Sequence, residues 1–512
     1  MPDEANPIMP FHVDTVCGTG ISALPPYLAV PPETVSVSDA RQLFVDDYLI
    51  DHTDLTRIYY PAKPYAENPV LTPQTAVECD NGICPVAGPF NDGVWFDPDD
   101  GMYKLWYHAG WFGGTALALS RDGIAWERPQ LDVVPGTNLV LPLNRRRMRD
   151  GSTVWLDTGA RSPDERWKMF LFEREVDDRN HVLREHGSVL SSADGIHWTF
   201  RGNTGPCGDN TGFYFDPFRN RWIFSIRGFS KDWKRMRCIV ERDDFFDCRW
   251  TTEEPAPWLW CDEQDRPDPV IGFVPQLYDF NAAAYESILI GVFGVMRGPE
   301  NNVCEANGIP KTIDLELGFS RDGVHWFRPS TGRPFLRSSR IAGRWDRGYL
   351  HAAGGIWVDA GDHIRFYYSG WSGISPRLSG SANGGHFAAN AMYAGAGTGF
   401  ATLRRDGFAA LCDYSGNGTV TTRPLVLSGC ELYVNYICPG GALKVEVLDA
   451  AGNVIPGYGA DEAVILDGDE LSARVLWRAN NRLPEHLSPL RFRFHVYRGA
   501  LYSFRCGNTA LS

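Results

Sequence analysis

The sequence has little of what marks nucleic-acid-binding, membrane-spanning or metal-binding proteins. Lys and Arg number 49 against 63 Asp and Glu, so the formal net charge is −14, whereas binding to nucleic-acid phosphates requires a basic surface. The one basic run, Arg145-Arg-Arg-Met-Arg149, we interpret as the rim of a loop. This acidic balance is typical of a soluble enzyme with a neutral substrate.

Targeting and metal-ligand patterns are also missing. Residues 1–37 are Pro-rich and irregular, with no basic start followed by an apolar run, so we expect no secretory signal, no membrane contact and a cytoplasmic location. The 12 cysteines fall in no metal-ligand spacing. Cys79 with Cys84 and Cys238 with Cys248 would suit disulfides in an oxidising compartment, but we expect buried reduced thiols.

A long helical periodicity is absent as well, which directs attention to turns and short strands. The chain has 53 Gly and 35 Pro among 512 residues, with 43% hydrophobic content, and this composition suits a turn-rich all-β protein with packed cores. The length suggests two or three domains.

One turn sequence recurs three times: Ser120-Arg-Asp-Gly-Ile-Ala-Trp126, Ser192-Ala-Asp-Gly-Ile-His-Trp198 and Ser320-Arg-Asp-Gly-Val-His-Trp326. Each Asp-Gly follows an alternating apolar run, which predicts a tight β-hairpin with a type I′ turn. Arg405-Asp-Gly-Phe408 lacks the Trp, and Arg242-Asp-Asp-Phe245 is a drifted copy. The pattern therefore predicts five units.

Further short strands precede every turn, as in Asp92-Gly-Val-Trp-Phe-Asp97 and Met102-Tyr-Lys-Leu-Trp-Tyr107. Four strands per unit at a period of roughly 50 to 85 residues predict propeller blades. We predict an irregular segment at 1–37, a five-bladed β-propeller catalytic domain at 38–413, and an accessory C-terminal β-sandwich at 416–512. Alternating apolar residues in Leu443-Lys-Val-Glu-Val-Leu448 favour the sandwich.

Polar residues recur just before the first strand of each unit, and first strands line the channel of a propeller and are entered from the same face. Residues at this mouth should therefore meet although they are far apart in sequence. They are Asn91, Asp92, Arg149, Asp150, Asp209, Asp279, Asn281, Tyr349 and His351. Neighbouring carboxylates raise one another's pKa, a cost that favours a sugar or metal site, with turn capping as the alternative.

The loops between second and third strands open on the same face. They carry His108, Trp111, Glu173, Arg227, and Trp371 with a Gly/Ser-rich lid reaching His386. Aromatic faces beside hydrogen-bonding groups suit a sugar subsite, although each Trp taken singly fits a core position equally well. The acids that end the first strands on the opposite face we interpret as turn residues: Asp97, Asp157, Asp216, Glu286 and Asp359.

Together these features resemble the five-bladed glycoside hydrolases of the invertase and arabinanase type, families 32, 43, 68 and 117. The resemblance rests on the Ser-x-Asp-Gly-x-x-Trp turns, on Asn68-Pro-Val-Leu71, and on a C-terminal module with Leu490-Arg-Phe-Arg-Phe494. Asn91-Asp92 is similar to the first-blade Asn-Asp of invertases, and Arg149-Asp150 to their second-blade Arg-Asp. Gly93 and Gly151 depart from the family's Pro, and Cys207-Gly-Asp209 replaces its Glu-Cys pair.

The resemblance implies hydrolysis of a furanoside, a fructofuranoside or an arabinofuranoside, by paired carboxylates. It implies Asp92 as nucleophile or base, Asp150 as stabiliser, and Asp209 or Glu173 as acid. The expected substrate-binding residues are Asn91, His108, Trp111, Arg149, Arg227, Asp279, His351 and Trp371.

Other readings of the same residues stay open. No cofactor is expected, with a structural Ca²⁺ in the channel as an alternative. A non-catalytic carbohydrate-binding propeller and a Ca²⁺-dependent polysaccharide-degrading enzyme, whose Asp ring would supply oxygen ligands, compete with the hydrolase. The expected partner is an oligosaccharide or glycoside, and a homo-oligomer is compatible with the sequence.

Overall fold

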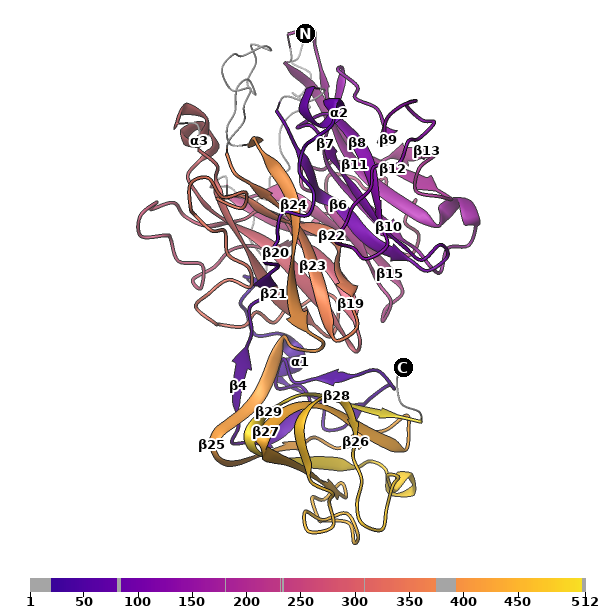
Figure 1. Cartoon of the computed structure of the whole chain (residues 1–512), viewed down its shortest axis with the longest axis vertical. Helices are drawn as coiled ribbons and strands as arrows, with labels where there is room; N and C mark the ends of the chain where they lie inside the picture. Colours follow the sequence, from indigo (N-terminus) through magenta and orange to yellow (C-terminus); the bar gives the residue numbers. More distant parts are fainter. Residues whose placement is uncertain are drawn as a thin grey trace.

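The structure is a computed structural model that describes residues 20–80, 84–179, 181–230, 232, 234–307, 309–373 and 393–508, without the side chains of Asp80, Glu305, Ser415 and Glu485. Within these residues, five four-stranded antiparallel sheets follow one another as blades (Figure 1). The predicted five-bladed β-propeller is confirmed. No helix in the described ranges is long and apolar enough to cross a membrane.

The first three blades each consist of four consecutive strands. They are β6 (Ala87–Asp97), β7 (Met102–Ala109), β8 (Gly114–Ser120) and β9 (Leu139–Leu141); β10 (Arg147–Leu156), β11 (Trp167–Val176), β12 (Val182–Ser192) and β13 (Thr199–Asn203); and β14 (Gly212–Asp216), β15 (Arg221–Phe229), β16 (Arg235–Arg242) and β17 (Ala256–Leu259).

The fourth blade has an interrupted inner strand, because β18 (Gln276–Leu277) and β19 (Asn281–Tyr285) both pair with β20 (Ile288–Gly298), whose other edge pairs with β21 (Thr312–Ser320). The fifth blade consists of β22 (Leu350–Asp359), β23 (His363–Trp371), β24 (Ala396–Arg404) and the N-terminal strand β5 (Lys63–Pro64). Short helices occur at α1 (Pro26–Ala29), α2 (Ala76–Asp80) and α3 (Asn301–Asn307), with 3-10 turns at Pro163–Glu165 and Glu485–Leu487.

Two sets of contacts close the ring. The inner strands are neighbours in the order β6, β10, β14, β19, β22 and back to β6. At the outer edge, Lys63 pairs with Thr402 and Pro64 with Ala401, so the start of the chain completes the last blade. Covering that edge with a strand of the same chain leaves fewer unpaired backbone groups for another molecule.

The repeated Asp-Gly turns differ from the type I′ prediction. In the three full copies only the glycine has positive φ, as at Gly123 with φ 70°, whereas in the fifth unit Asp406 has φ 61°. The aspartate instead caps the turn: Asp122 Oδ1 accepts hydrogen bonds from the backbone N–H groups of Ile124 (2.8 Å) and Ala125 (2.9 Å). Aspartate side chains favour such turns because they bond the backbone two residues on.

Side chains of the preceding blade contact each turn. Trp106 Nε1 of the first blade donates to the carbonyl of Gly195 in the second blade at 2.8 Å, and Tyr367 of the fifth blade donates to the carbonyl of Gly123 in the first at 2.5 Å. A Cβ on Gly195 would lie 2.6 Å from Trp106 Cζ2. The turn is therefore repeated because every blade must dock onto its neighbour, and it serves as scaffold.

The C-terminal strands form a second unit with its own hydrophobic core, which includes Phe44, Phe492, Phe494 and Phe504. Its pairing runs β28 (Leu466–Arg474), β27 (Glu431–Leu448), β29 (Arg491–Gly507), β25 (Ala409–Thr422) and β3 (Ile50–Thr53), with β2 (Gln42–Leu43) on β29 and β4 (Thr56–Tyr59) on β25. A separate parallel pair is formed by β1 (Val35–Ser36) and β26 (Leu425–Val426).

This pairing gives one seven-stranded sheet, and the predicted two-sheet sandwich is not confirmed. The domain boundaries stay predictions, but residues 42–59, which we assigned to the propeller, pair with the C-terminal sheet. Figure 1 shows β25 and β4 running together from the blades into this sheet. The described cysteines form no disulfide bonds with one another.

Candidate functional site at one mouth of the propeller channel

The inner strands lose their regular pairing at one end of the channel. Register shifts occur between Gly88 and Gly93 in β6, between Arg149 and Ser152 in β10, and between Ala352 and Trp357 in β22. Irregular segments re-aim side chains that a regular strand would point between sheets. The predicted residues Asn91, Asp92 and Asp150 lie within these breaks, which brings them to the channel mouth.

Asn91, Asp279, Asn281 and His351 come together, as predicted. Asn91 Oδ1 accepts hydrogen bonds from Asn281 Nδ2 at 3.2 Å and from His351 Nε2, and His351 Nε2 lies 3.5 Å from Asp279 Oδ2. Burial lowers the pKa of His351 well below its ordinary value, with nearby Lys311 adding to the effect. His351 is thus a neutral imidazole that links the first, fourth and fifth blades.

Asp279 supplies the carboxyl group of this cluster. Burial raises its pKa to about 7, against the opposing effects of Arg237 and of the Gly294 N–H, which donates to Asp279 Oδ1 at 2.9 Å. The carboxyl therefore changes protonation near neutral pH.

Asp92 binds Arg149 across the first two blades. Arg149 Nη2 lies 2.8 Å from Asp92 Oδ1, and Arg149 Nη1 donates to Thr115 Oγ1 at 2.5 Å. Burial raises the pKa of Asp92, and Arg149 opposes that rise. The side chain of Asp92 is 0% exposed.

His108 lies on the same wall. Its Nε2 donates to the backbone carbonyl of Asp150 at 2.8 Å, and burial, then Arg149, lower its pKa. In the described part of the chain, the buried polar atoms without a hydrogen-bond partner include Asn91 Nδ2, Asp92 Oδ2, His108 Nδ1 and Asp150 Oδ1 at this mouth. Buried polar atoms are almost always hydrogen-bonded, so such a cluster suits a ligand rich in hydroxyl groups.

Arg174 is the centre of the second cluster and binds three carboxylates. Its Nη1 contacts Asp150 Oδ2, its Nη2 lies 2.8 Å from Asp209 Oδ2, and its Nε lies 3.0 Å from Glu185 Oε1. Arg227 binds the other oxygen of Asp209 at 2.5 Å. One planar guanidinium can hold several carboxylates because its donors spread in a fixed fork.

These three carboxyl groups have pKa values shifted in different directions. For Asp209, burial acts to raise the pKa, but Arg227 and Arg174 outweigh it, so the pKa is held below the ordinary range. For Asp150 and Glu185, burial raises the pKa, Arg174 opposes it and the charge of Asp209 adds to the rise. The expected repulsion between neighbouring carboxylates contributes to the raised pKa values of Asp150 and Glu185, but burial is the larger cause and arginines lie between the acids.

Accessibility also differs among the acids. The side chains of Asp209 and Glu185 are 18% and 15% exposed, against 6% for Asp150. Glu185 was not among the predicted residues, although it lies directly opposite Arg174 in the β11–β12 pairing. Cross-strand neighbours share a face, so this register is the signal that identifies Glu185.

Glu173 does not join this cluster. It binds Arg147 Nη2 at 2.5 Å and lies 3.6 Å from His186. Successive residues of a strand point to opposite faces, and Arg174 takes the face toward Asp150 and Asp209. The prediction that Glu173 points into the same pocket is therefore wrong.

Trp111 and Trp371 are covered by other rings. Trp111 stacks on Tyr393 with centroids 4.3 Å apart, and Trp371 stacks on Tyr349 at the same distance. Both tryptophans are almost fully buried, so they form the aromatic support of the mouth instead of offering a free face to a sugar. The predicted lid through His386 lies outside the described residues, because 374–392 are not included.

A metal ion finds no ready ligand set here. Among the described residues, no group of three or more His, Cys, Asp or Glu side chains is placed to hold one. Asp92, Asp150 and Asp209 each bind an arginine instead. The positive charge that balances these acids comes from guanidinium groups.

The known structures that are similar to this chain have low sequence identity to it. No protein-family model and no curated protein matches it. Similar solved structures include an N-acetylgalactosamine deacetylase from F. plautii (15% identity, TM-score 0.44, 69% of this chain and 95% of that one) and an alpha-L-arabinofuranosidase from Lactobacillus brevis (11%, 0.41, 65% and 97%). A beta-1,2-mannobiose phosphorylase from Listeria innocua is also similar (14%, 0.43, 67% and 96%). The expected structural resemblance to glycoside hydrolases is confirmed at this level, which assigns no chemistry to this chain.

Proposed function

We propose that the chain is a glycoside hydrolase whose acid and base are Glu185 and Asp209. The observation that carries the proposal is that one guanidinium, that of Arg174, holds two partly exposed carboxyl groups whose pKa values move in opposite directions. Acid–base pairs in enzymes are recognised by environments that push their pKa values apart.

Glu185 is proposed as the general acid. Its raised pKa keeps the proton on the carboxyl group to higher pH than an ordinary glutamate does. In the reaction this proton passes to the glycosidic oxygen as the bond from that oxygen to the anomeric carbon breaks. The leaving group departs as a neutral alcohol, and positive charge develops on the sugar ring.

Asp209 is proposed as the ionised partner. Arg227 and Arg174 keep its carboxylate charged and fixed in orientation, so it can stabilise the oxocarbenium-like sugar and then either bond to it or take a proton from water. Asp150 shares Arg174 with these two groups, and the charge of Asp209 adds to the raised pKa of Asp150. This differs from the roles implied by the family resemblance, in which Asp92 is the nucleophile or base and Asp209 or Glu173 is the acid.

The substrate class is proposed to be a furanoside. Support comes from the invertase-like pairs Asn91-Asp92 and Arg149-Asp150, which meet at this mouth through the ion pair of Arg149 with Asp92. The unpartnered atoms of Asn91, Asp92 and His108 offer hydrogen bonds to sugar hydroxyls. Arginines and aspartates balance one another at the site, which suits an uncharged ligand.

Hydrolysis of 4-nitrophenyl furanosides and pyranosides, and of sucrose, by the wild type and by Glu185→Gln and Asp209→Asn tests the proposal. We expect one class of compound to be cleaved, with kcat/KM lowered about 10³-fold or more in both variants. Asp132→Asn is a matched control, because Asp132 is exposed and, among the described residues, pairs only with His197; it should retain full activity. Circular dichroism and thermal unfolding check that each variant is folded.

Two results would overturn the assignment. Cleavage that persists in both Glu185→Gln and Asp209→Asn but is lost in Asp92→Asn would return the chemistry to the first blade. Binding of sugars without cleavage of any compound would mean a non-catalytic propeller.

A further inference from the structure

The opposite mouth of the channel holds a separate pocket of about 660 Å³. The end of each blade's inner strand contributes to its lining: Trp95 of β6, Trp155 of β10, Phe215 of β14, Ala284 of β19 and Trp357 of β22. Cavities of roughly 300 to 1,000 Å³ are the usual size for small-ligand sites. The acids proposed for hydrolysis do not line this pocket.

Its walls are aromatic rings set at steep angles. The rings of Trp95 and Trp155 lie 4.8 Å apart at 66°, and those of Trp155 and Trp222 lie 6.3 Å apart at 81°. Two indoles are fixed by hydrogen bonds to neighbouring blades: Trp95 Nε1 donates to Val154 O at 2.8 Å, and Trp357 Nε1 to Ala284 O at 2.9 Å. Rings held in place lose little entropy when a ligand binds.

Most of the charged groups that line the pocket are paired. Lys168 binds Asp157 at 2.7 Å, Arg161 lies 3.8 Å from Asp244, and Arg221 contacts Asp243. Lys168 also lies over the rings of Trp222 and Phe246, 5.4 Å from each centroid. These ion pairs neutralise the groups named, and their oxygens and nitrogens keep further hydrogen-bonding capacity.

Ring faces bordered by paired charges match the two surfaces of a neutral sugar, whose C–H face packs on aromatic rings and whose hydroxyls bond to polar edges. We infer that this pocket is a second site, one that binds a neutral oligosaccharide without cleaving it. The inference does not depend on hydrolysis at the other mouth. With the site proposed at the other mouth, the channel lined by the five inner strands binds a ligand at each end.

The pocket offers a blocking variant with little risk to folding. A Cβ added to Gly159, which lines the pocket, meets only Asp157 Oδ1 at 3.5 Å, an ordinary contact. Gly159→Trp should therefore obstruct the pocket without disturbing the blade. Phe246→Ala removes one ring of the wall from a partly buried position and serves as the second variant.

Binding is measured by calorimetry and tryptophan fluorescence in the Glu185→Gln background, so that cleavage does not consume the probes. The probes are the pentaoses of maltose, cellulose, xylan, mannan and 1,5-arabinan, with trigalacturonate as a charged comparison. We expect at least one neutral pentaose to bind, with Kd weakened about tenfold or more by both Gly159→Trp and Phe246→Ala. Adding Asp209→Asn should leave this Kd unchanged.

Three outcomes would overturn the inference. Affinity that falls with Asp209→Asn but not with Gly159→Trp would locate the sugar at the other mouth. Tighter binding of trigalacturonate through the pocket would contradict the neutral ligand, and no binding of any pentaose by folded protein would refute the site. Failure of the proposed hydrolysis would leave all of these measurements interpretable, because they record binding only.

Discussion

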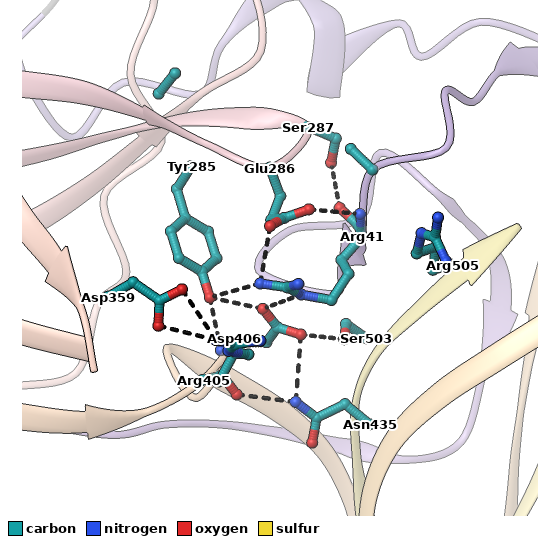
Figure 2. A network of polar contacts seen from close by, with 12 residues as sticks. Arg41, Tyr285, Glu286, Ser287, Asp359, Arg405, Asp406, Asn435, Ser503 and Arg505 are labelled. Carbon is teal, nitrogen blue, oxygen red and sulfur yellow. Dashed lines mark hydrogen bonds and ion pairs between the residues drawn. The ribbon is translucent and has the colours of Figure 1, made fainter. Parts of the chain in front are cut away.

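Tyr285 of the fourth blade donates its hydroxyl proton to the buried carboxylate of Asp406 at 2.7 Å (Figure 2). Asp406 is the aspartate of the Asp-Gly turn in the fifth unit, which lacks the Trp. Three more donors reach the same carboxylate: Arg41 Nε at 2.9 Å, Ser503 Oγ at 2.6 Å and Asn435 Nδ2 at 3.2 Å. The last copy of the repeat thus joins the preceding blade to the C-terminal sheet.

Replacing Asp406 with Ala should cost about 3 kcal/mol or more of unfolding free energy. The change removes the acceptor of Arg41 Nε and of three neutral donors, although Arg41 keeps its ion pair with Glu286, and breaking a buried ion pair costs on this scale. Urea unfolding measures the loss. Asp362→Ala is the matched control, because Asp362 lies on the same blade, is 78% exposed and pairs only with its neighbour His363. Equal stability of the two variants would mean that the network does not hold the units together.

Two glycines with almost equal φ separate backbone strain from packing. Gly195 (φ 77°) contacts Trp106 of the preceding blade, whereas Gly101 (φ 70°) has open space around its Cα. Gly101→Ala should cost about 1 kcal/mol, from the left-handed backbone alone. Gly195→Ala should cost about 2 kcal/mol more, because its Cβ displaces Trp106. Thermal unfolding that shifts equally in both variants would contradict the docking role of the turn.

The sequence predicts the propeller because each blade repeats the turn that docks it onto its neighbour. The pairing of Lys63 with Thr402 and of Gln42 with Phe504 was not predicted, because two-residue strands joined across most of the chain carry no local pattern. The convergence of Asp92, Asp150 and Asp209 followed from topology alone.

Side-chain direction and charge environment at the site were harder to predict. A shift of one residue in register moves a side chain to the other face of a strand. The sequence alone therefore does not distinguish Glu173 from Arg174 as the residue of β11 that faces the acids, nor does it identify Glu185, which lies opposite Arg174. From the number of acids alone, repulsion between carboxylates is the expected cause of the pKa shifts. The arginines that lie between the acids come from β10, β11 and β15, and only the fold brings them to the site.

The activity, measured as kcat/KM, should extend to lower and to higher pH than it would with an ordinary aspartate and an ordinary glutamate. Asp209 must be ionised, and its lowered pKa keeps it so to lower pH than an ordinary aspartate. Glu185 must be protonated, and its raised pKa keeps it so to higher pH than an ordinary glutamate. Activity should therefore fall on the basic side through the pKa of Glu185. In Glu185→Gln the residual activity should lose this basic limb, and a basic limb that survives unchanged would exclude Glu185 as the acid.

Arg174 should matter more for its shape than for its charge. Arg174→Met removes the counter-charge that Asp150, Asp209 and Glu185 share, although Arg227 still binds Asp209, so their pKa values rise and kcat/KM should fall about 100-fold or more. Arg174→Lys keeps the charge but cannot bind three carboxylates through one planar fork, and it should recover only part of the activity. The acidic limb should move to higher pH in Arg174→Met, because Asp209 then takes up its proton more readily. Full activity of Arg174→Lys would mean that charge alone suffices.

The raised pKa of Asp279 predicts how the free energy of unfolding changes with pH. Its pKa in the folded protein is raised to about 7, against about 3.9 in an unfolded chain. Between these values the folded state binds more protons than the unfolded state, so this group makes the unfolding free energy fall as pH rises. Asp279→Asn mimics the protonated carboxyl and removes this contribution, which amounts to roughly 3 to 4 kcal/mol once both titrations are complete. Urea unfolding should therefore find the variant gaining stability relative to the wild type between pH 5 and pH 8. If the difference between variant and wild type is constant over that range, the Asp279 carboxyl does not carry a raised pKa.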